Sequence, residues 1–193
     1  MDNPELILYP TESVYGLGVN PFAKEALLRL YELKGRSESK PVSWLVRDFA
    51  DIERYAEVNN TARTLAEQFL PGPLTLVLKL RPEYSSYGAT DGTIGFRVST
   101  DKVAQALIKE WYVKYDAPIT ATSANLSGEN SLATVEDILA QFCDRKSRIT
   151  RVIDDGPRTG TPSTVVRVNS DGTLEVLRES AIKYALIREK CGL

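Results

Sequence analysis

The chain has 193 residues, of which 42% are hydrophobic and 26% charged, and its formal net charge is -2. These values are ordinary for a globular protein, and we expect a single domain over residues 1–193. The charge balance excludes a general basic field that would draw the chain onto nucleic acid, so any RNA role needs a local patch. Because no apolar run reaches membrane-spanning length and no signal-peptide pattern opens the chain, we expect no membrane association.

The composition also restricts the chemistry. There is no histidine, which excludes Ser-His-Asp and Cys-His catalysis and zinc sites built on histidine. The two cysteines, Cys143 and Cys191, lie far apart in no motif, as expected for reduced thiols of a cytoplasmic protein. The remaining candidates are carboxylates, lysines, arginines, hydroxyls, backbone amides, or a metal that arrives with a substrate.

In chain order, apolar runs and helical periodicity predict strands that alternate with helices. Strands are expected at 5–9, 41–46, 74–80, 93–99, 118–123, 149–154, 163–168 and 173–177. Helices are expected at 20–36, 48–56, 60–70, 100–113, 134–142 and 180–190. The helix ends are marked by Asn20 as a cap, Gly35 at an exit, and Thr134 as a cap with Asp137 at the reciprocal position. The "NSDG" at 169–172 predicts a hairpin, and the whole pattern indicates an α/β fold with a mixed, twisted sheet.

Small polar stretches follow several of these strands and helices. They are "YPTESVYGLG" (9–18), "KGRSESKP" (34–41), "TIGFRV" (93–98), "TSANLSG" (122–128) and "GTPSTVVRV" (160–168). Each alone has an ordinary explanation. "TSANLSG" would be a turn whose side chains hydrogen-bond to its own backbone, and Arg97 would form a surface ion pair. Lys34 and Arg36 would complement a helix dipole. Because strand ends form the usual ligand rim of an open α/β sheet, several such stretches together favour a polar-lined cleft. No P-loop is present, and Gly16 with Gly18 is only a weak dinucleotide signal.

The segments "YPTESVYGLG", "KGR....P", "PGPLTLVL", "TIGFRV", "SANLSG" and "PSTVV", in this order, resemble the YrdC family over nearly the whole chain. The resemblance implies a twisted, open, mixed and mostly parallel sheet with helices on its faces and a deep, positively lined concave cleft. It implies a nucleotidyltransferase that converts L-threonine, bicarbonate and ATP, with Mg²⁺, into L-threonylcarbamoyladenylate and pyrophosphate. The product would pass to the tRNA threonylcarbamoyl transferase complex for threonylcarbamoyladenosine modification, with weak or no direct tRNA binding by this chain.

The resemblance also implies residue roles. The threonine side would be formed by Thr11, Ser13, Arg97 and Ser163, with Arg97 holding the carboxylate as a fork. The ATP side would be formed by Lys34, Arg36, Lys40, Thr93, Ser123, Asn125, Ser131 and Arg178. Lys34 and Arg36 would be the catalytic cations at the phosphates, no protein metal ligand is implied, and Gly16 and Gly18 would keep the backbone clear of the substrate. Such chemistry suits these residues, because preorganised cations stabilise departing pyrophosphate and a carbamate needs orientation more than a strong base.

Two other functions stay open at this point. One is a non-catalytic RNA-binding module that uses the same cleft, against which the net charge of -2 and the lack of basic stripes with aromatics count. The other is a carbamoyl-adenylate-forming domain like that of hydrogenase maturation proteins, which are normally longer chains with zinc fingers. The substrate that triggers pyrophosphate release from ATP separates all three.

Overall fold

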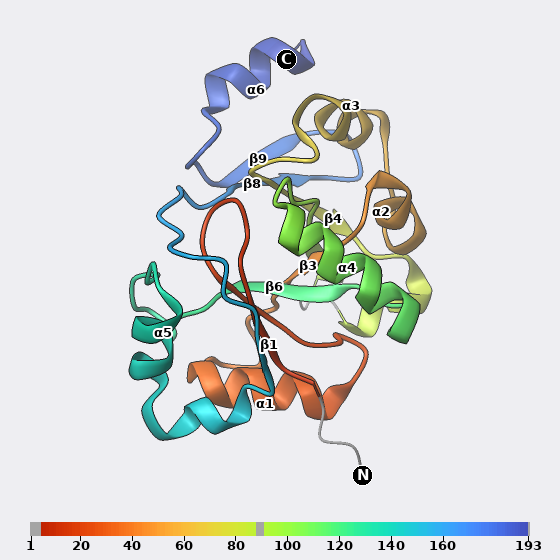
Figure 1. Ribbon diagram of the computed structural model, residues 1–193. Coiled ribbons are helices and arrows are strands. Elements are labelled where there is room, and N and C mark those ends of the chain that lie inside the picture. Colours follow the sequence, from red (N-terminus) through yellow and green to blue (C-terminus); the bar gives the residue numbers. More distant parts are fainter. Residues whose placement is uncertain (1–4, 88–90, 193) are drawn as a thin grey trace.

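In the computed structural model, which describes residues 5–87 and 91–192, nine strands form one sheet in the order β7-β1-β2-β6-β3-β5-β4-β8-β9 (Figure 1). The strands are β1 (Ile7–Tyr9), β2 (Gly16–Gly18), β3 (Ser43–Leu45), β4 (Leu74–Lys79), β5 (Thr93–Arg97), β6 (Ile119–Ser123), β7 (Arg151–Val152), β8 (Thr164–Val168) and β9 (Leu174–Arg178). All eight expected strands are present, most of them shorter than expected.

The described residues also form six α-helices and two short 3₁₀ helices. They are α1 (Lys24–Lys34), α2 (Phe49–Tyr55), α3 (Asn60–Phe69), α4 (Lys102–Tyr115), α5 (Val135–Phe142) and α6 (Tyr184–Cys191), with η1 (Pro82–Tyr87) and η2 (Cys143–Arg148). Each predicted helix is found. The capping of α5 by Thr134, whose hydroxyl accepts from Asp137 N at 3.2 Å, is confirmed, as is the end of α1 at a left-handed Gly35.

The expected start of the first helix is wrong by several residues. Asn20 Oδ1 accepts from Phe22 N at 2.9 Å, and the Asn20 carbonyl accepts from Ala23 N at 3.1 Å. Asn20 and Pro21 therefore belong to a turn that precedes α1, and no side chain caps the helix itself. The last helix likewise begins at Tyr184, four residues after the expected start at residue 180.

The sheet is open and mixed as expected, but it is not mostly parallel. Of the eight strand pairings among the described residues, three are parallel and five antiparallel. The pairs β1/β2, β4/β5 and β8/β9 are each consecutive in the chain and joined without a crossover α-helix, so the chain reverses direction between them. The short strand β2, which the sequence did not predict, adds a further antiparallel pairing with β6.

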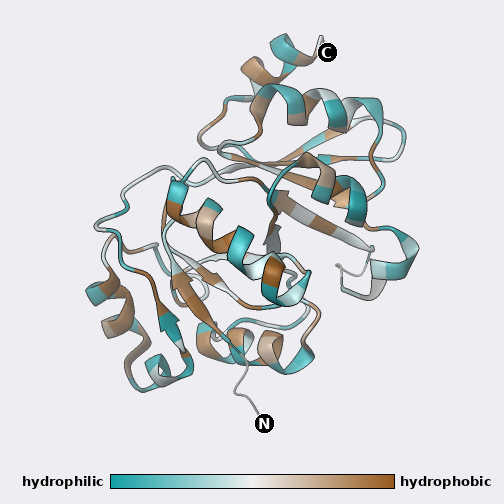
Figure 2. Ribbon diagram, turned by 45° about the vertical axis from the view of Figure 1, so that its right-hand side comes forward, coloured by the Kyte–Doolittle hydropathy of each residue, from teal (hydrophilic) through white to brown (hydrophobic). Residues whose placement is uncertain are grey.

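The first strand explains how the core is divided. Along the apolar run that contains β1, Ile7 and Tyr9 pack into one hydrophobic cluster, whereas Leu6 and Leu8 pack into another. Since side chains alternate across a strand, the two clusters lie on opposite faces of the sheet. Helices α1 and α5 contribute to the second cluster and α2, α3 and α4 to the first. In Figure 2 several strands are mostly brown, and the helices carry both teal and brown turns, as expected for helices with one buried and one exposed face.

The same alternation creates the site. In the half of the sheet formed by β3, β5, β4 and β8, one transverse row consists of four fully buried residues that pack under α2 to α4: Trp44, Phe96, Leu76 and Val166. The neighbouring row places Arg97 beside Thr75 and Val165 on the opposite face. These three residues line a cavity, so this face of the sheet forms its floor.

Candidate functional site: an arginine-lined cleft

A cavity of about 250 Å³ opens above the strands β3, β4, β5 and β8. Three arginines line it: Arg36, Arg97 and Arg178. No aspartate or glutamate is among the described residues of this lining, and the remaining polar groups are hydroxyls. An excess of guanidinium groups in a confined space favours anionic ligands with carboxylate or phosphate groups.

A second, larger hollow of about 620 Å³ adjoins the first. The two share Val14, Ser123, Ser131, Pro162 and Arg178 in their linings, so they form one continuous cleft. The second hollow adds Asn125 from the loop that follows β6. The cleft therefore has room for a ligand with two parts, one over the sheet and one beside this loop.

The hydroxyl of Ser13 lies where the loop after β1 meets Arg97. Thr11 Oγ1 donates to the Val14 carbonyl at 2.6 Å, so in the 3.1 Å contact between the two hydroxyls Ser13 is the donor. Ser13 Oγ then accepts from Arg97 Nη2 at 3.4 Å. Thr11 thus shapes its own turn and orients Ser13, and Ser13 is the member of the pair that lines the cavity.

Arg178 and Ser163 form the opposite side. Arg178 donates through Nε and Nη2 to the Ser163 carbonyl at 3.1 and 2.7 Å, and Ser163 Oγ lies 2.8 Å from Thr75 Oγ1. Burial, and then repulsion from Arg97, lowers the pKa of Arg178. Because the positive charge of Arg97 disfavours the charged form of Arg178, an anion placed between them would relieve an unfavourable arrangement.

Arg36 reaches the cavity from the segment after α1. Its Nε donates to the Lys40 carbonyl at 3.1 Å and its Nη2 to the Pro41 carbonyl at 3.0 Å. These backbone contacts hold the guanidinium at the cavity wall. The neighbouring Lys40 supplies only its carbonyl here, and its exposed side chain lies outside both linings.

Lys34 behaves differently from Arg36. It is 2% exposed, and its ammonium donates to the carbonyls of Ser123 and of Asn125, the latter at 2.7 Å. It lines neither hollow. Burial, and then repulsion from Arg36, lowers the pKa of Lys34 to about 7. In this arrangement the ammonium holds the loop after β6 in place from beneath.

Asn125 has one unsatisfied atom. Its Nδ2 donates to the carbonyls of Leu126 at 2.8 Å and of Glu129 at 2.7 Å, which fixes the orientation of the amide. Its Oδ1 is buried and has no hydrogen-bond partner among the described residues. Buried polar atoms are rarely left unpaired, so this oxygen is a candidate to accept from, or to coordinate, a ligand in the second hollow.

Eight of the twelve residues expected at the site line one or both hollows: Ser13, Arg36, Arg97, Ser123, Asn125, Ser131, Ser163 and Arg178. Thr11, Lys34, Lys40 and Thr93 do not. Thr93 lies four residues before Arg97 on β5, and its hydroxyl donates to Asp91 at 2.7 Å. The structure therefore brings most of the expected set together and leaves Thr93 toward the other end of its strand.

The two glycines of the first motif serve packing. A side-chain carbon at Gly18 would lie 2.4 Å from Ile119 and 2.9 Å from Tyr9, and one at Gly16 would lie 3.0 Å from the Tyr9 ring. These contacts give a packing reason for both glycines, and the expectation that they keep the backbone clear of a substrate stays a prediction. Strand β2 can pass between these buried side chains only because it has no side chains at these positions.

The sequence reasoning missed several contributors. Thr75, Ser43 and Val165 line the cavity. Glu12 contacts Arg97, and Ser99 contacts Glu12. Thr75 could have been noticed as the only hydroxyl in the apolar run "LTLVLKL". Ser99 and Glu12 gave no such signal, because their importance depends on a contact between segments more than eighty residues apart.

Comparison with known proteins agrees with this geometry. A family model for Sua5, YciO and YrdC proteins, described as "Telomere recombination", matches residues 1–180, and the chain belongs to this family. A putative threonylcarbamoyl-AMP synthase of Methanocaldococcus jannaschii is 34% identical over 93% of this chain and 82% of its own length. A threonylcarbamoyl-AMP synthase of Bacillus subtilis is 36% identical over 86% of this chain and 47% of its own.

Among solved structures, Pyrococcus abyssi Sua5 complexed with L-threonine superposes with a TM-score of 0.84. It is 32% identical, and the match covers 97% of this chain and 54% of that one. The chain thus spans about half the length of the B. subtilis and P. abyssi relatives.

Two further findings concern the described part of the chain. None of its helices is long and apolar enough to cross a bilayer. Cys143 and Cys191 are both free thiols.

Proposed function

We propose that this protein is a threonylcarbamoyl-AMP synthase, which forms L-threonylcarbamoyladenylate and pyrophosphate from L-threonine, bicarbonate and ATP. The observation that carries the proposal is the convergence of Arg36, Arg97 and Arg178 on one cavity without an opposing acid in its described lining. Both substrates that must be held, an amino-acid carboxylate and a triphosphate, are anions. The names of the M. jannaschii and B. subtilis relatives and the L-threonine complex of P. abyssi Sua5 support the same assignment.

The amino acid would lie over the sheet. Arg97 offers a guanidinium fork for its carboxylate, with Ser13 and Ser163 beside it as hydroxyl partners. Thr11 takes part through Ser13, whose hydroxyl it orients. Thr75 supports Ser163 in the same way from β4.

The nucleotide would lie along the second hollow. Ser123, Asn125 and Ser131 line it, and Arg178 lies where the two hollows meet. Arg36, on the wall of the first hollow, would face the phosphates. Arg36 would stabilise charge that builds on the departing pyrophosphate. Lys34 would act with it by holding the Ser123–Asn125 turn, and Lys40 and Thr93 would contact nucleotide at the margin of the cleft.

Mg²⁺ would accompany ATP. No group of three or more cysteine, aspartate or glutamate side chains in the described ranges could hold a metal alone. We expect the ion to be bound chiefly by phosphate oxygens, with the unpaired Oδ1 of Asn125 as the protein oxygen suited to it or to its water. When bound, Mg²⁺ would neutralise phosphate charge during pyrophosphate departure.

The test is substrate-dependent pyrophosphate release. The purified chain should release pyrophosphate only when ATP, L-threonine and bicarbonate are all present, and mass spectrometry should detect L-threonylcarbamoyladenylate. Arg97→Ala should weaken threonine binding far more than ATP binding in calorimetry.

Release triggered by carbamoyl phosphate in place of threonine and bicarbonate would instead support the hydrogenase-maturation type of reaction. Tight RNA binding without any release would support the RNA module. The product would then be consumed by the transferase complex that modifies tRNA.

A further inference from the structure

Glu12 is a carboxylate beside the site for which the proposed reaction has no use. Its side chain is 15% exposed, and that of its partner Arg97 is 11% exposed. Arg97 Nη2 donates to Glu12 Oε1 at 2.5 Å. Arg97 lines the cavity and Glu12 does not. The carboxylate therefore contacts the guanidinium from outside the cavity lining.

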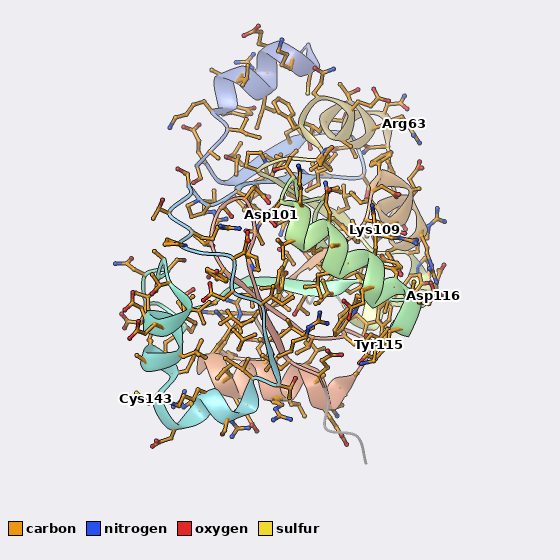
Figure 3. All side chains as sticks on the ribbon, in the orientation of Figure 1. Arg63, Asp101, Lys109, Tyr115, Asp116 and Cys143 are labelled. Atoms are coloured by element: carbon orange, nitrogen blue, oxygen red, sulfur yellow. The ribbon has the colours of Figure 1, made fainter. Side chains whose placement is uncertain are left out.

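The second oxygen of Glu12 is anchored on a different element. The backbone N–H of Asp101 donates to Ser99 Oγ at 3.1 Å, which leaves the hydroxyl proton of Ser99 for Glu12 Oε2. Asp101 caps α4 by accepting from Val103 N and Ala104 N, both at 2.9 Å, and Figure 3 shows it at this end of the helix. Glu12 is thus tied to a rigid helix start.

The guanidinium itself depends on this contact. Arg97 Nε is buried without a hydrogen-bond partner among the described residues, so only Nη2 is held, by Glu12 and more weakly by Ser13. A guanidinium carries five N–H donors in a rigid planar fork. When Nη2 is tied to a fixed carboxylate, rotation of this planar group is restricted, and so is the direction of its remaining N–H donors.

We infer that Glu12 is a positioning residue that aligns the Arg97 guanidinium for the carboxylate of the amino-acid substrate. The inference rests on the proposed function, because it takes an amino acid as the ligand of Arg97. The opposite arrangement would be a competitor: Glu12 would occupy Arg97 until the ligand carboxylate displaced it. The anchoring by Ser99 and the absence of Glu12 from the cavity lining favour positioning over competition.

Calorimetry distinguishes the positioning role of Glu12 from the competing role, because the two change the Kd for L-threonine in opposite directions when Glu12 is replaced. In Glu12→Gln the Kd for L-threonine should rise roughly tenfold, the order expected for one lost charge-assisted hydrogen bond, while the Kd for ATP stays close to the parent value. Ser99→Ala, which removes only the anchor of Glu12, should give a smaller rise. The control is Glu110→Gln, which breaks the exposed ion pair between Glu110 and Arg151. This variant should bind L-threonine and ATP as the parent does. An unchanged or tightened threonine Kd in Glu12→Gln would overturn the inference.

A second readout needs no ligand. In ¹H–¹⁵N spectra, the side-chain N–H signals of Arg97, assigned with Arg97→Lys, should report restricted rotation in the parent and faster rotation in Glu12→Gln. Unchanged signals would refute the alignment whatever the pocket binds. If the parent itself binds no L-threonine, the proposed function fails, and the spectra still decide the role of Glu12. If Glu12→Gln does not fold, Ser99→Ala carries both measurements.

Discussion

Lys34→Met tests whether the lysine of the "KGR" segment supports the cleft from beneath. The substitution keeps an unbranched side chain, shorter by its terminal nitrogen, and removes both its charge and its donors. In the parent, the buried ammonium donates to the carbonyls of Ser123 and Asn125. Its only described partners are thus neutral backbone groups, and burial accordingly lowers the pKa of Lys34 from 10.5 to about 7.

This lowered pKa makes the effect of the substitution depend on pH. Below pH 7 the lysine is protonated in both the folded and the unfolded chain, and folding carries the full cost of burying its charge, roughly 5 kcal/mol for a fall from 10.5 to about 7. Between pH 7 and 10.5 the unfolded chain binds the extra proton, so stability rises with pH. Above pH 10.5 both states are neutral and the cost is gone. A neutral amine still has two N–H groups for its two carbonyls.

Urea unfolding followed by circular dichroism measures this directly. The free energy of unfolding of the parent, relative to Lys34→Met, should increase by roughly 2–3 kcal/mol between about pH 7 and pH 9. Lys24→Met, at the exposed start of the same helix, controls for the loss of a lysine from α1. A difference between parent and Lys34→Met that stays flat over this range would refute the buried position of the ammonium. It would return Lys34 to the alternative of a solvated charge at a helix end, worth about 0.3–1 kcal/mol.

Three further outcomes are expected. Arg36→Ala should fold as the parent does but lose roughly 10²–10³ in the rate of pyrophosphate release, because it removes a preorganised cation; near-parent turnover at saturating substrates would exclude the phosphate role. Gly160→Ala should lower the free energy of unfolding by about 1–3 kcal/mol in urea titrations, because its new side-chain carbon would lie 2.7 Å from backbone atoms of Ser13. The control Thr159→Ala, at the neighbouring position, should have little effect. Binding of unmodified tRNA, followed by fluorescence anisotropy, should collapse between about 50 and 200 mM salt, and a tight, salt-resistant complex would contradict the weak-binding expectation for a chain of net charge -2.

Local patterns in the sequence sufficed for much of the framework. The run "ELILY" predicts a buried strand, and the structure buries it on both faces, with Leu8 and Tyr9 in different clusters. The helix end at Gly35 follows from its tolerance of left-handed backbone. The ordered motifs also identified the family, and eight of the twelve residues they implied line the cleft, because most of them lie at or beside the ends of elements that surround one face of the sheet.

Only the tertiary structure decided how these residues divide their tasks. Strand β2 has little intrinsic preference for its conformation and exists because β1 and β6 pair with it on both sides. Thr75 faces the cavity beside Arg97 because of the register between β4 and β5, which no local pattern encodes. Lys34 and Arg36 are two residues apart, yet one ammonium is buried beneath a loop and the other cation lines the cavity. Neighbouring side chains on a turn point in different directions, and what each one meets there depends on packing with segments far away in the chain.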